Sequence, residues 1–249
     1  MHNLFPIEEG KFNFMCHKGL SCFTKCCFNL NLILTPYDVL RIKKRLNIDS
    51  NTFIDNYADI DMEEYPPFPV LKLRMDENKK CPFLTKEGCS LYDDRPTACR
   101  LYPLARASTS TGKEVKERFF LIKEEHCLGL NEDRQWEIKE WIKHEGVEEY
   151  DKFNLPWFEI VTSHNELLSD VKDNLFKNMK AFFMASYNLE SFKKYILNDK
   201  FFKIYNVPER YRDISEDTDV LSLSLEWIGF VLYGKKGNII NPMDTSQGY

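Results

Sequence analysis

The sequence lacks an excess of positive charge, a long apolar run and an N-terminal targeting pattern. Its formal net charge is −5 at pH 7, which gives no basis for binding nucleic acid or an anionic membrane. Residues 1–14 show no basic stretch followed by an apolar run, so no signal peptide is predicted. The most apolar late stretch, Val220–Tyr233, is interrupted by Glu226 and is too short to span a bilayer. We therefore expect a cytoplasmic protein with no membrane or nucleic-acid partner.

The sequence also lacks the motifs of several large enzyme classes. It contains no G-x-S-x-G, no Walker loop and no G-x-G-x-x-G. The C-x3-C-x2-C spacing expected of a radical S-adenosylmethionine enzyme is missing as well. No nucleophile or general base can be assigned from these residues, so we predict no catalytic residues and leave enzymatic activity open.

Cysteine is unevenly distributed along the chain. All eight cysteines lie between Cys16 and Cys127, and none follows. Disulfides are typical of small secreted domains, whereas a chain of 249 residues can bury a sizeable core without them. In a reducing compartment the thiols need another explanation, and thiolates are soft ligands that select zinc, copper(I) or iron–sulfur clusters. We predict that the metal ligands are Cys16, Cys22, Cys26, Cys27, Cys81, Cys89, Cys99 and Cys127.

The spacing of the cysteines limits the kind of centre. A four-thiolate zinc site and a cubane cluster each take four ligands, so eight cysteines fill two sites, or one site with spare thiols. Neighbouring Cys26 and Cys27 project in different directions, so the pair either feeds two sites or braces one polynuclear centre. One or two of the eight could instead be buried small hydrophobes. No C-x2-C knuckle is present, which favours an iron–sulfur centre, most of all 4Fe–4S, over zinc.

Two arginines flank Cys99 within the segment 81–103. Arg95 and Arg100 are predicted to be cofactor-binding residues that donate N–H bonds to thiolate or sulfide and offset negative charge. For Arg95 an equal alternative is a surface ion pair with Asp93 or Asp94.

The histidines are weaker candidates. His17 and His126 each adjoin a cysteine, but with eight thiols available we expect them to lie behind the ligands or in solvent. His144 and His164 are expected to be isolated and solvated on helical faces. Asp38 is interpreted as a helix-start residue rather than a catalytic base.

The first half of the chain predicts short elements. Phe28–Leu34 and Val70–Met75 are the two best strand candidates. A helix is expected to begin after Thr35, which can act as N-cap, with proline at the first helical position and Asp38 at the third. A second short helix is expected after residue 49 or 50, and the proline-rich stretch 65–69 is expected to be a loop.

The second half predicts helices. Asn131 is expected to cap a helix that includes Trp136. Stretches 206–209 and 215–219 are interpreted as breaks between further amphipathic segments, which are Trp157–Val171, Leu175–Tyr187, Leu189–Leu197 and Val220–Tyr233. The predicted fold class is α+β, a small irregular cysteine-rich metal-binding core with short strands followed by a helical C-terminal half. The predicted domains are a metal-binding domain at 1–130 and a helical region at 131–249 packed on it.

The stretch Phe14–Cys127 resembles the YkgJ-like cysteine-cluster family, described as zinc- or iron-chelating proteins with eight recurring cysteines. The matching residues are the cluster 16–27, the segment 34–42, and the motifs Cys81-Pro-Phe-Leu, Cys89-Ser-Leu-Tyr, Arg95-Pro-Thr-Ala-Cys-Arg-Leu-Tyr-Pro and Cys127-Leu-Gly. The common family spacing is C-x2-C-x2-C-C, whereas the first cluster here is C-x5-C-x3-C-C, which looks like one branch of the family. Flagellin lysine methylases are similar to it at a greater distance. The resemblance implies metal binding and no particular reaction.

Three functions are compatible with these patterns. The leading interpretation is an iron–sulfur or zinc protein acting in electron transfer, metal handling or maturation of another protein, which would be its partner. The second is a structural zinc module whose helical half binds a partner. The third is a protein-modifying enzyme of the lysine-methylase kind, and it depends on the likeness alone.

Overall fold

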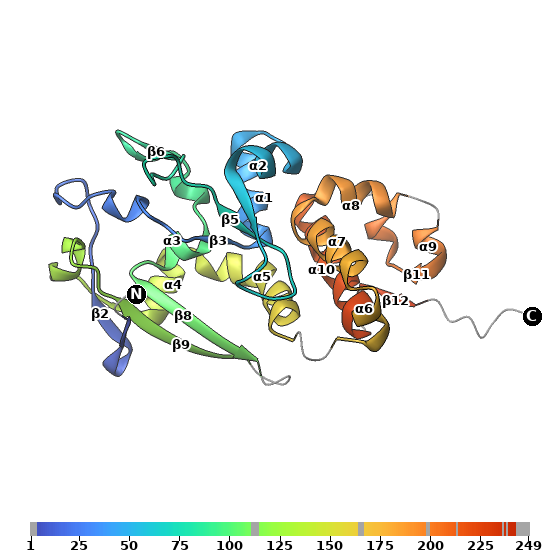
Figure 1. Ribbon diagram of the computed structural model, residues 1–249. Coiled ribbons are helices and arrows are strands. Elements are labelled where there is room, and N and C mark those ends of the chain that lie inside the picture. The colour runs from blue at the N-terminus through green and yellow to red at the C-terminus, as the bar shows by residue number, and fades with distance from the viewer. Residues whose placement is uncertain are drawn as a thin grey trace, which may run out of the picture.

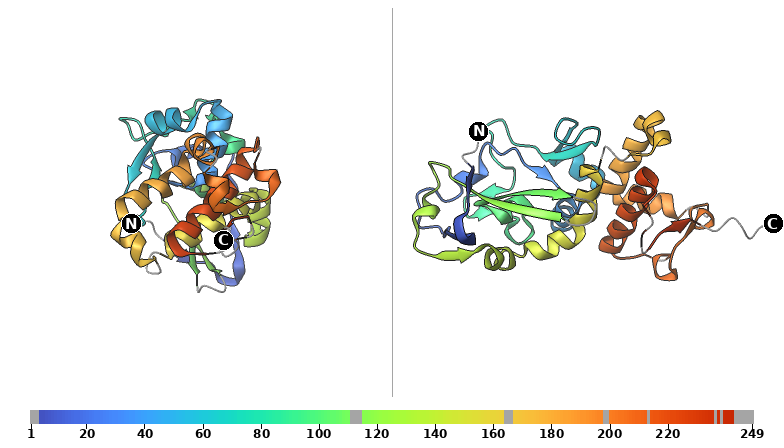
Figure 2. Two further views of the ribbon diagram at one scale, coloured as in Figure 1. Left: turned by 90° about the vertical axis from the view of Figure 1, so that its right-hand side faces the viewer. Right: turned by 90° about the horizontal axis from the view of Figure 1, so that it is seen from below.

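The computed structural model describes residues 4–110, 115–163, 167–197, 200–212, 214–235, 237 and 239–242. Short strands and irregular segments make up the N-terminal part, and helices dominate after residue 137. Figure 1 and the right-hand view of Figure 2 show helices α6 to α10 gathered at one end of the molecule, with the strands of the first half at the other. The predicted α+β class is confirmed.

The strands form small antiparallel sheets. The longest pairing is the hairpin of β8 (Leu104–Ser110) and β9 (Val115–Ile122), and β9 also pairs with β1 (Leu4–Pro6). A second three-stranded sheet has the order β3-β5-β4. The strands of this sheet are β3 (Ile33–Leu34), β5 (Val70–Leu73) and β4 (Ala58–Asp61). The remaining described strands form pairs, which are β2 (Lys11–Asn13) with β10 (Gln135–Glu137), β6 (Leu84–Thr85) with β7 (Gly88–Cys89), and β11 (Tyr205–Asn206) with β12 (Asn241–Pro242).

Ten α-helices are present in the described ranges. Six of them follow residue 145 and supply half of the buried residues of the large core. Their bounds are α1 (Pro36–Leu46), α2 (Ser50–Tyr57), α3 (Thr97–Leu101), α4 (Ile138–His144), α5 (Val147–Thr162), α6 (Ser169–Asp173), α7 (Leu175–Tyr187), α8 (Leu189–Ile196), α9 (Phe201–Ile204) and α10 (Asp217–Tyr233).

The predicted start of α1 is confirmed. Thr35 is the N-cap, its hydroxyl accepts from the Asp38 N–H, and the Thr35 N–H donates to Asp38 Oδ2 over 2.9 Å. These reciprocal bonds satisfy donors that a helix N-terminus leaves free. The other oxygen, Asp38 Oδ1, accepts from the N–H and the hydroxyl of Thr97, at 2.8 and 2.7 Å. Because Thr97 begins α3, one buried carboxylate joins the first turns of two helices.

Other predictions for the first half also agree with the structure. The two best strand candidates contain β3 and β5, and these strands pair with each other. Helix α2 follows Asp49, whose side chain accepts from the Thr52 N–H. Residues 65–69 lie in a loop. The hairpin of β8 and β9, in contrast, was not predicted.

The prediction of one helix from Asn131 through Trp136 is wrong. Gln135–Glu137 form strand β10 beside β2, and the Trp136 indole N–H donates to the Phe14 carbonyl over 2.9 Å. Helix α4 begins only after Glu137, which forms a capping box with Glu140. Tertiary pairing with β2 overrides the helical spacing of the apolar residues in this stretch.

Two further boundaries differ from the prediction. The expected segment Trp157–Val171 is divided between the end of α5 and the start of α6. The acidic stretch 215–219, predicted as a break, contains the first residues of α10. Asp217 and Asp219 lie in the first turn of this helix, where negative side chains interact favourably with the helix dipole. Helices α7 and α8 begin at the predicted residues, and stretch 206–209 is not helical until the short 3-10 turn at 209–211.

The main hydrophobic cluster takes residues from both halves of the chain. It extends from Leu32 to Ile240 and includes Phe53 and Phe68 as well as Trp157 and Trp227. A smaller cluster beside the first strands contains Phe12, Phe14, Leu104, Trp136 and Trp141. The predicted division at residue 130 stays a prediction. In the described part of the chain, no helix is both long enough and apolar enough to cross a membrane.

Replacement of Asp38 by alanine is expected to lower the free energy of unfolding by about 3 kcal/mol, because buried donors on both Thr35 and Thr97 would lose their acceptor. The matched control is Asp49→Ala, which removes the exposed N-cap of α2 and should cost about 1 kcal/mol. Urea denaturation followed by circular dichroism measures both. Equal effects of the two substitutions would contradict the bridging role of Asp38.

Candidate metal centre

Four of the cysteines lie in the irregular segment between β2 and β3. Cys26 and Cys27 end this run within a short 3-10 helix, Lys25–Cys27. Thr24 before it and Asn29 after it have left-handed backbone conformations, with φ of 69° and 55°. These two turns reverse the chain tightly around the cysteine pair, so the adjacent thiols are presented from a compact loop.

Three more cysteines come from the segment 81–99. Cys89 lies on β7, the second strand of a hairpin whose strands have two residues each, and Cys99 lies on α3. Gly88, at the turn of the hairpin, has a φ of +116°, which side-chain-bearing residues rarely adopt. The Phe23 ring of the first segment packs 3.4 Å from the position that a Gly88 Cβ would take. The hairpin therefore needs glycine for its turn, and its outer side lies next to the first cysteine loop.

The two cysteine segments lie side by side in the structure. The Cys81 N–H donates to the Cys27 carbonyl over 2.9 Å, and the Asn29 N–H donates to the Lys79 carbonyl over 2.7 Å. Phe28 and Lys80 form an isolated antiparallel bridge between these bonds. More than 50 residues separate the two segments in sequence. A short stretch of β-type pairing thus joins them next to Cys27 and Cys81.

Cys127 approaches from a third segment. The N–H of its neighbour Leu128 donates to the Cys22 sulfur over 3.3 Å. The Met15 N–H donates to the Gly129 carbonyl over 3.0 Å, and this bond holds the two segments of the chain side by side next to Cys16. A Cβ on Gly129 would lie 2.8 Å from the Met15 carbonyl oxygen, so only glycine permits this approach. These contacts place the segment of Cys127 beside the first cysteine loop.

All eight cysteines are free thiols, and they influence one another electrostatically. Burial raises the pKa of the Cys16 thiol to about 11, with further contributions from Cys26, Cys22 and Cys127. Cys26 and Cys27 share a hydrogen bond that lowers the pKa of Cys26 and raises that of Cys27. Such mutual repulsion is expected where several thiolates would have to ionise together, and a bound cation relieves it.

Burial also raises the pKa of the thiols in the second segment. For Cys99 the neighbouring Cys81, Cys26 and Cys89 add to the effect of burial. The pKa of Cys127 is raised by burial as well, and the hydrogen bond with the Tyr102 hydroxyl partly offsets this. Tyr102 in turn donates to Glu124 over 3.0 Å, so its ring position is held from two sides.

Arg95 is a cation whose charge affects several of the thiols. Its guanidinium lowers the pKa of cysteines from the first two segments, namely Cys16, Cys26, Cys89 and Cys99. The predicted alternative, a pair with Asp93 or Asp94, is wrong, because Arg95 Nη2 pairs with Glu145. The guanidinium stacks over the Tyr92 ring at 4.2 Å, and its buried Nε has no hydrogen-bond partner among the described residues.

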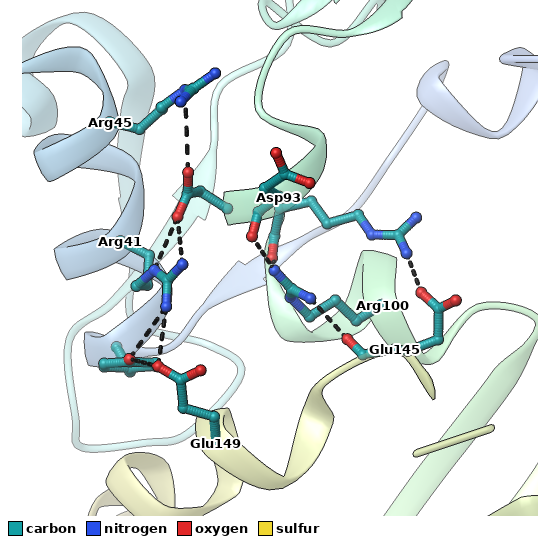
Figure 3. Close-up of polar contacts among 9 residues, drawn as sticks. Arg41, Arg45, Asp93, Arg100, Glu145 and Glu149 are labelled. Carbon is teal, nitrogen blue, oxygen red and sulfur yellow. Dashed lines mark hydrogen bonds and ion pairs between the residues drawn. The ribbon is translucent and has the colours of Figure 1, made fainter. Parts of the chain in front are cut away.

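Arg100 has a different environment from the one predicted. Its Nε donates to the Arg95 carbonyl over 3.0 Å and its Nη1 to the Glu145 carbonyl over 2.6 Å, while Nη2 donates to the Asp93 carbonyl. Figure 3 shows the side chain reaching between Asp93 and Glu145. The guanidinium also lies over the Tyr150 ring at 4.4 Å. The bonds observed for Arg100 are thus to the main chain around α3, and a bond to a thiolate has no counterpart among them.

Asp94 belongs to a separate ionic network on α1. Its carboxylate accepts from Arg41 at 2.8 and 2.6 Å, and Arg45 lies 4.0 Å away. Arg41 also donates to Glu149 of α5 over 2.9 Å (Figure 3). The network connects α1, the segment before α3, and α5, so it fixes the position of the Cys99 helix from outside.

The histidines lie near acidic side chains rather than in a ligand set. His17 Nε2 is 3.6 Å from Glu132, and its Nδ1 accepts from the Gly19 N–H; His126 Nε2 is 3.3 Å from Glu124. His144 is half-exposed but not isolated, because it packs against Trp136 and Trp141, with ring centroids 4.7 and 5.9 Å away. That part of the prediction is wrong. His164 lies outside the described residues.

A shallow cavity of about 580 Å³ lies on α4 and β10, apart from the cysteine segments. The Arg134 guanidinium stacks over the Trp136 ring at 3.9 Å on its wall. The other lining residues are Gln135, Glu140, Lys143 and His144.

The chemistry of the donor set fits a soft metal or an iron–sulfur cluster. Eight free thiols converge from three segments, and a buried arginine nitrogen beside them lacks an acceptor. Within the described ranges, no three His, Cys, Asp or Glu side chains are already arranged to hold a metal ion. Hydrogen bonds join the segments that carry the thiols, but the described side chains form no preformed ligand set.

Comparison with known proteins gives one family. Residues 15–132 match the model of the CxxCxxCC family, whose description is "putative zinc- or iron-chelating domain". This range contains all eight cysteines. Neither a curated protein nor a solved structure matches the chain.

Replacement of Gly129 by alanine is expected to cost about 2 kcal/mol of unfolding free energy, because the added methyl would collide with the Met15 carbonyl and the Phe14 ring. The matched control is Gly229→Ala in α10, where the added methyl meets nothing within 4 Å. That variant should be more stable by about 0.5 to 1 kcal/mol. Thermal unfolding of both variants and the wild-type protein measures the difference. If both variants shift the melting temperature in the same direction, the close contact at Gly129 does not determine the stability of this region.

Arg100→Gln is expected to lower the free energy of unfolding by about 3 kcal/mol, since the buried Glu145 carbonyl and the part-buried Asp93 carbonyl would lose a charged donor. Arg45→Gln, at a half-exposed side chain, should change it by less than about 0.5 kcal/mol. Urea denaturation of the metal-free proteins provides the comparison. A small effect at Arg100 would argue against its structural role around α3.

Proposed function

We propose, from the match of residues 15–132 to the CxxCxxCC family model, that the protein carries iron–sulfur chemistry, most of all 4Fe–4S, on its cysteine thiolates. The proposed role is electron transfer with a protein partner. The single observation that supports the proposal most strongly is the convergence of eight free cysteines from three distant segments. Such a group of soft donors has no structural purpose in a chain that already possesses a large apolar core.

The choice of iron–sulfur over zinc follows from the arrangement of the ligands in the chain. Structural zinc sites usually take pairs of thiolates from C-x2-C turns, and no such pair exists here. The adjacent Cys26 and Cys27 instead lie on one tight 3-10 turn. A pair of this kind is suited to polynuclear centres, where thiolates bind different metal atoms within a small volume.

The surroundings of the thiols supply the hydrogen bonds and charge that tune such a centre. The Leu128 N–H donates to Cys22, and Arg95 lowers the pKa of Cys16, Cys26, Cys89 and Cys99. Donors directed at ligating sulfur stabilise the more negative, reduced form of a cluster. Arg95 is the residue we assign to charge compensation, with Glu145 and Tyr92 holding its guanidinium in place.

The surface near the thiols supports a protein partner. Cys16 is exposed, and the apolar side chains of Phe28, Tyr92 and Leu128 are also exposed, by 44, 59 and 38%. Phe28 and Leu128 are each the direct neighbour of a cysteine. A bound iron–sulfur cluster supplies one-electron transfer, and an apolar rim of this kind allows a redox protein to exclude water between the two centres. Metal handling or maturation of a client protein would use the same rim.

Anaerobic purification is expected to give a brown protein in which iron and acid-labile sulfide are present in equal amounts. Dithionite should bleach the visible absorption reversibly, because reduction changes the sulfide-to-iron charge transfer. Iron, zinc and sulfide are quantified together on the same sample.

The midpoint potential is compared between two matched variants, Arg95→Gln and Arg95→Lys. Loss of the positive charge in the glutamine variant should lower the potential, and the lysine variant should restore part of it.

A colourless protein that contains only stoichiometric zinc after anaerobic purification would overturn the iron–sulfur proposal. In that case chelation would unfold the cysteine-bearing half, because metal-binding free energy is folding free energy in a structural zinc module.

A further inference from the structure

The cavity beside α4 and β10 has a polar, mostly cationic lining, and none of its lining residues is a cysteine. Its volume of about 580 Å³ lies within the range of small-molecule sites. Two parts of the chain form its wall. One is the start of β10 with the residue before it, and the other is α4, which together supply Arg134, Gln135, Trp136, Glu140, Lys143 and His144.

The guanidinium of Arg134 is held in place on the wall of this cavity. It stacks over the Trp136 ring at 3.9 Å. Both residues are tied to Phe14, whose N–H donates to the Arg134 carbonyl and whose carbonyl accepts from the Trp136 indole N–H, each over 2.9 Å. A stacked guanidinium loses little further side-chain freedom when it binds a ligand, and its planar edge offers paired N–H donors. The site is therefore preorganised on the side of β10.

The two permanent cations of the cavity have no acidic partner. In the parts of the chain that the structure describes, no ion pair or hydrogen bond joins the Arg134 guanidinium or the Lys143 ammonium to a carboxylate. Glu140 is the one carboxylate in the lining, and its Oε2 accepts from the Glu137 N–H over 3.3 Å in the capping box of α4. The cations are thus left free to bind a ligand.

The helix dipole explains only part of this charge. Lys143 and His144 lie in the last turn of α4, where positive side chains interact favourably with the dipole. Arg134 comes from a different element and lines the same cavity, which the dipole of α4 does not require. Cations from two elements therefore meet at one site.

His144 completes the wall at the end of α4. Its ring centroid lies 4.7 Å from that of Trp136, and its Nδ1 lies 2.9 Å from Glu145 Oε1. This contact fixes the ring and leaves Nε2 as the nitrogen for a ligand. The other carboxylate oxygen of Glu145 pairs with Arg95, so an anion in the cavity does not compete with Arg95 for its partner.

We propose that this cavity binds a small anion through a carboxylate or phosphate group, with Arg134 and Lys143 as the residues that hold it. Two permanent cations face one carboxylate here, in a chain whose formal net charge is −5. Guanidinium groups recognise both kinds of anion through paired N–H bonds. Because Trp136 is 7% exposed and lies under Arg134, the site selects charge rather than a stacked aromatic ring. The proposal goes beyond the metal-binding function and does not depend on it.

Titration of the wild-type protein, with its metal content as purified, tests the site. Sodium phosphate and sodium succinate are added separately, and sodium chloride keeps the ionic strength constant so that general screening does not change. Isothermal titration calorimetry should show saturable binding of at least one of the two anions to a single site. Binding of phosphate alone identifies a phosphate ligand, and binding of succinate alone identifies a carboxylate ligand.

The indole N–H signals of the tryptophans locate the bound anion. In a nitrogen-15 NMR titration the signals of Trp136 and Trp141 should shift, because both rings pack against His144. The signals of Trp157 and Trp227, which belong to the main hydrophobic cluster, should stay in place. Shifts confined to Trp157 and Trp227 would place the anion elsewhere and overturn the proposal.

Charge-removing variants test the assigned residues. Arg134→Gln should weaken binding about tenfold and Lys143→Gln about threefold, because charge-assisted hydrogen bonds are lost. Glu140→Gln should tighten binding about twofold, since glutamine keeps the capping bond to Glu137 and removes a repelling charge. The matched control is Lys139→Gln, which removes an exposed charge from the same helix outside the cavity and should leave the affinity unchanged.

No saturable binding of either anion would overturn the proposal. It would also be overturned if Arg134→Gln bound as well as the wild type, or if Lys139→Gln weakened binding as much as Arg134→Gln, because binding would then follow general surface charge. Circular dichroism verifies that each variant is folded. A protein that binds the anion but neither iron nor zinc would contradict the proposed function and support this site.

Discussion

A single buried carboxylate determines where the second cysteine segment lies. Asp38 accepts hydrogen bonds from the first turns of α1 and α3, and it is 1% exposed. Burial raises the pKa of this carboxyl, and the four hydrogen bonds to Thr35 and Thr97 act against that shift. Because α3 carries Cys99 and is only five residues long, it has little stability of its own and depends on this link. The Asn154 side chain of α5 completes the network from Tyr37 to Thr97.

The helical half supports this link from outside. Lys43 of α1 is buried and its Nζ lies 2.5 Å from Glu190 of α8, while the Tyr187 hydroxyl of α7 donates to the Leu34 carbonyl over 3.1 Å. Arg100 adds main-chain contacts between α3 and the turn before α5. The cysteine segments are therefore held on a frame of ordinary helix packing. Their own irregular backbone, with few strands of more than four residues, would not maintain their positions alone.

Electrostatics gives the thiol region its function. Eight ionised cysteines in one small region would repel one another strongly, and Arg95 lowers the pKa of several of them. A chain gains nothing from collecting such groups unless a positive centre is added to them. In the proposed function, the exposed Cys16 and the apolar rim face the partner, and the core covers the buried thiols.

The sequence by itself determined the local features: the number and spacing of the cysteines, the capping box at Thr35 and Asp38, and the starts of α7 and α8. Each depends on residues a few positions apart, so the pattern contains the whole cause. Other features of the protein were decided only by the tertiary structure. Trp136 lies in a strand because β2 is available to pair with it, and Arg95 binds Glu145 because α4 ends beside α3. Which thiols are neighbours depends on contacts such as that between Cys27 and Cys81, which spacing along the chain cannot encode.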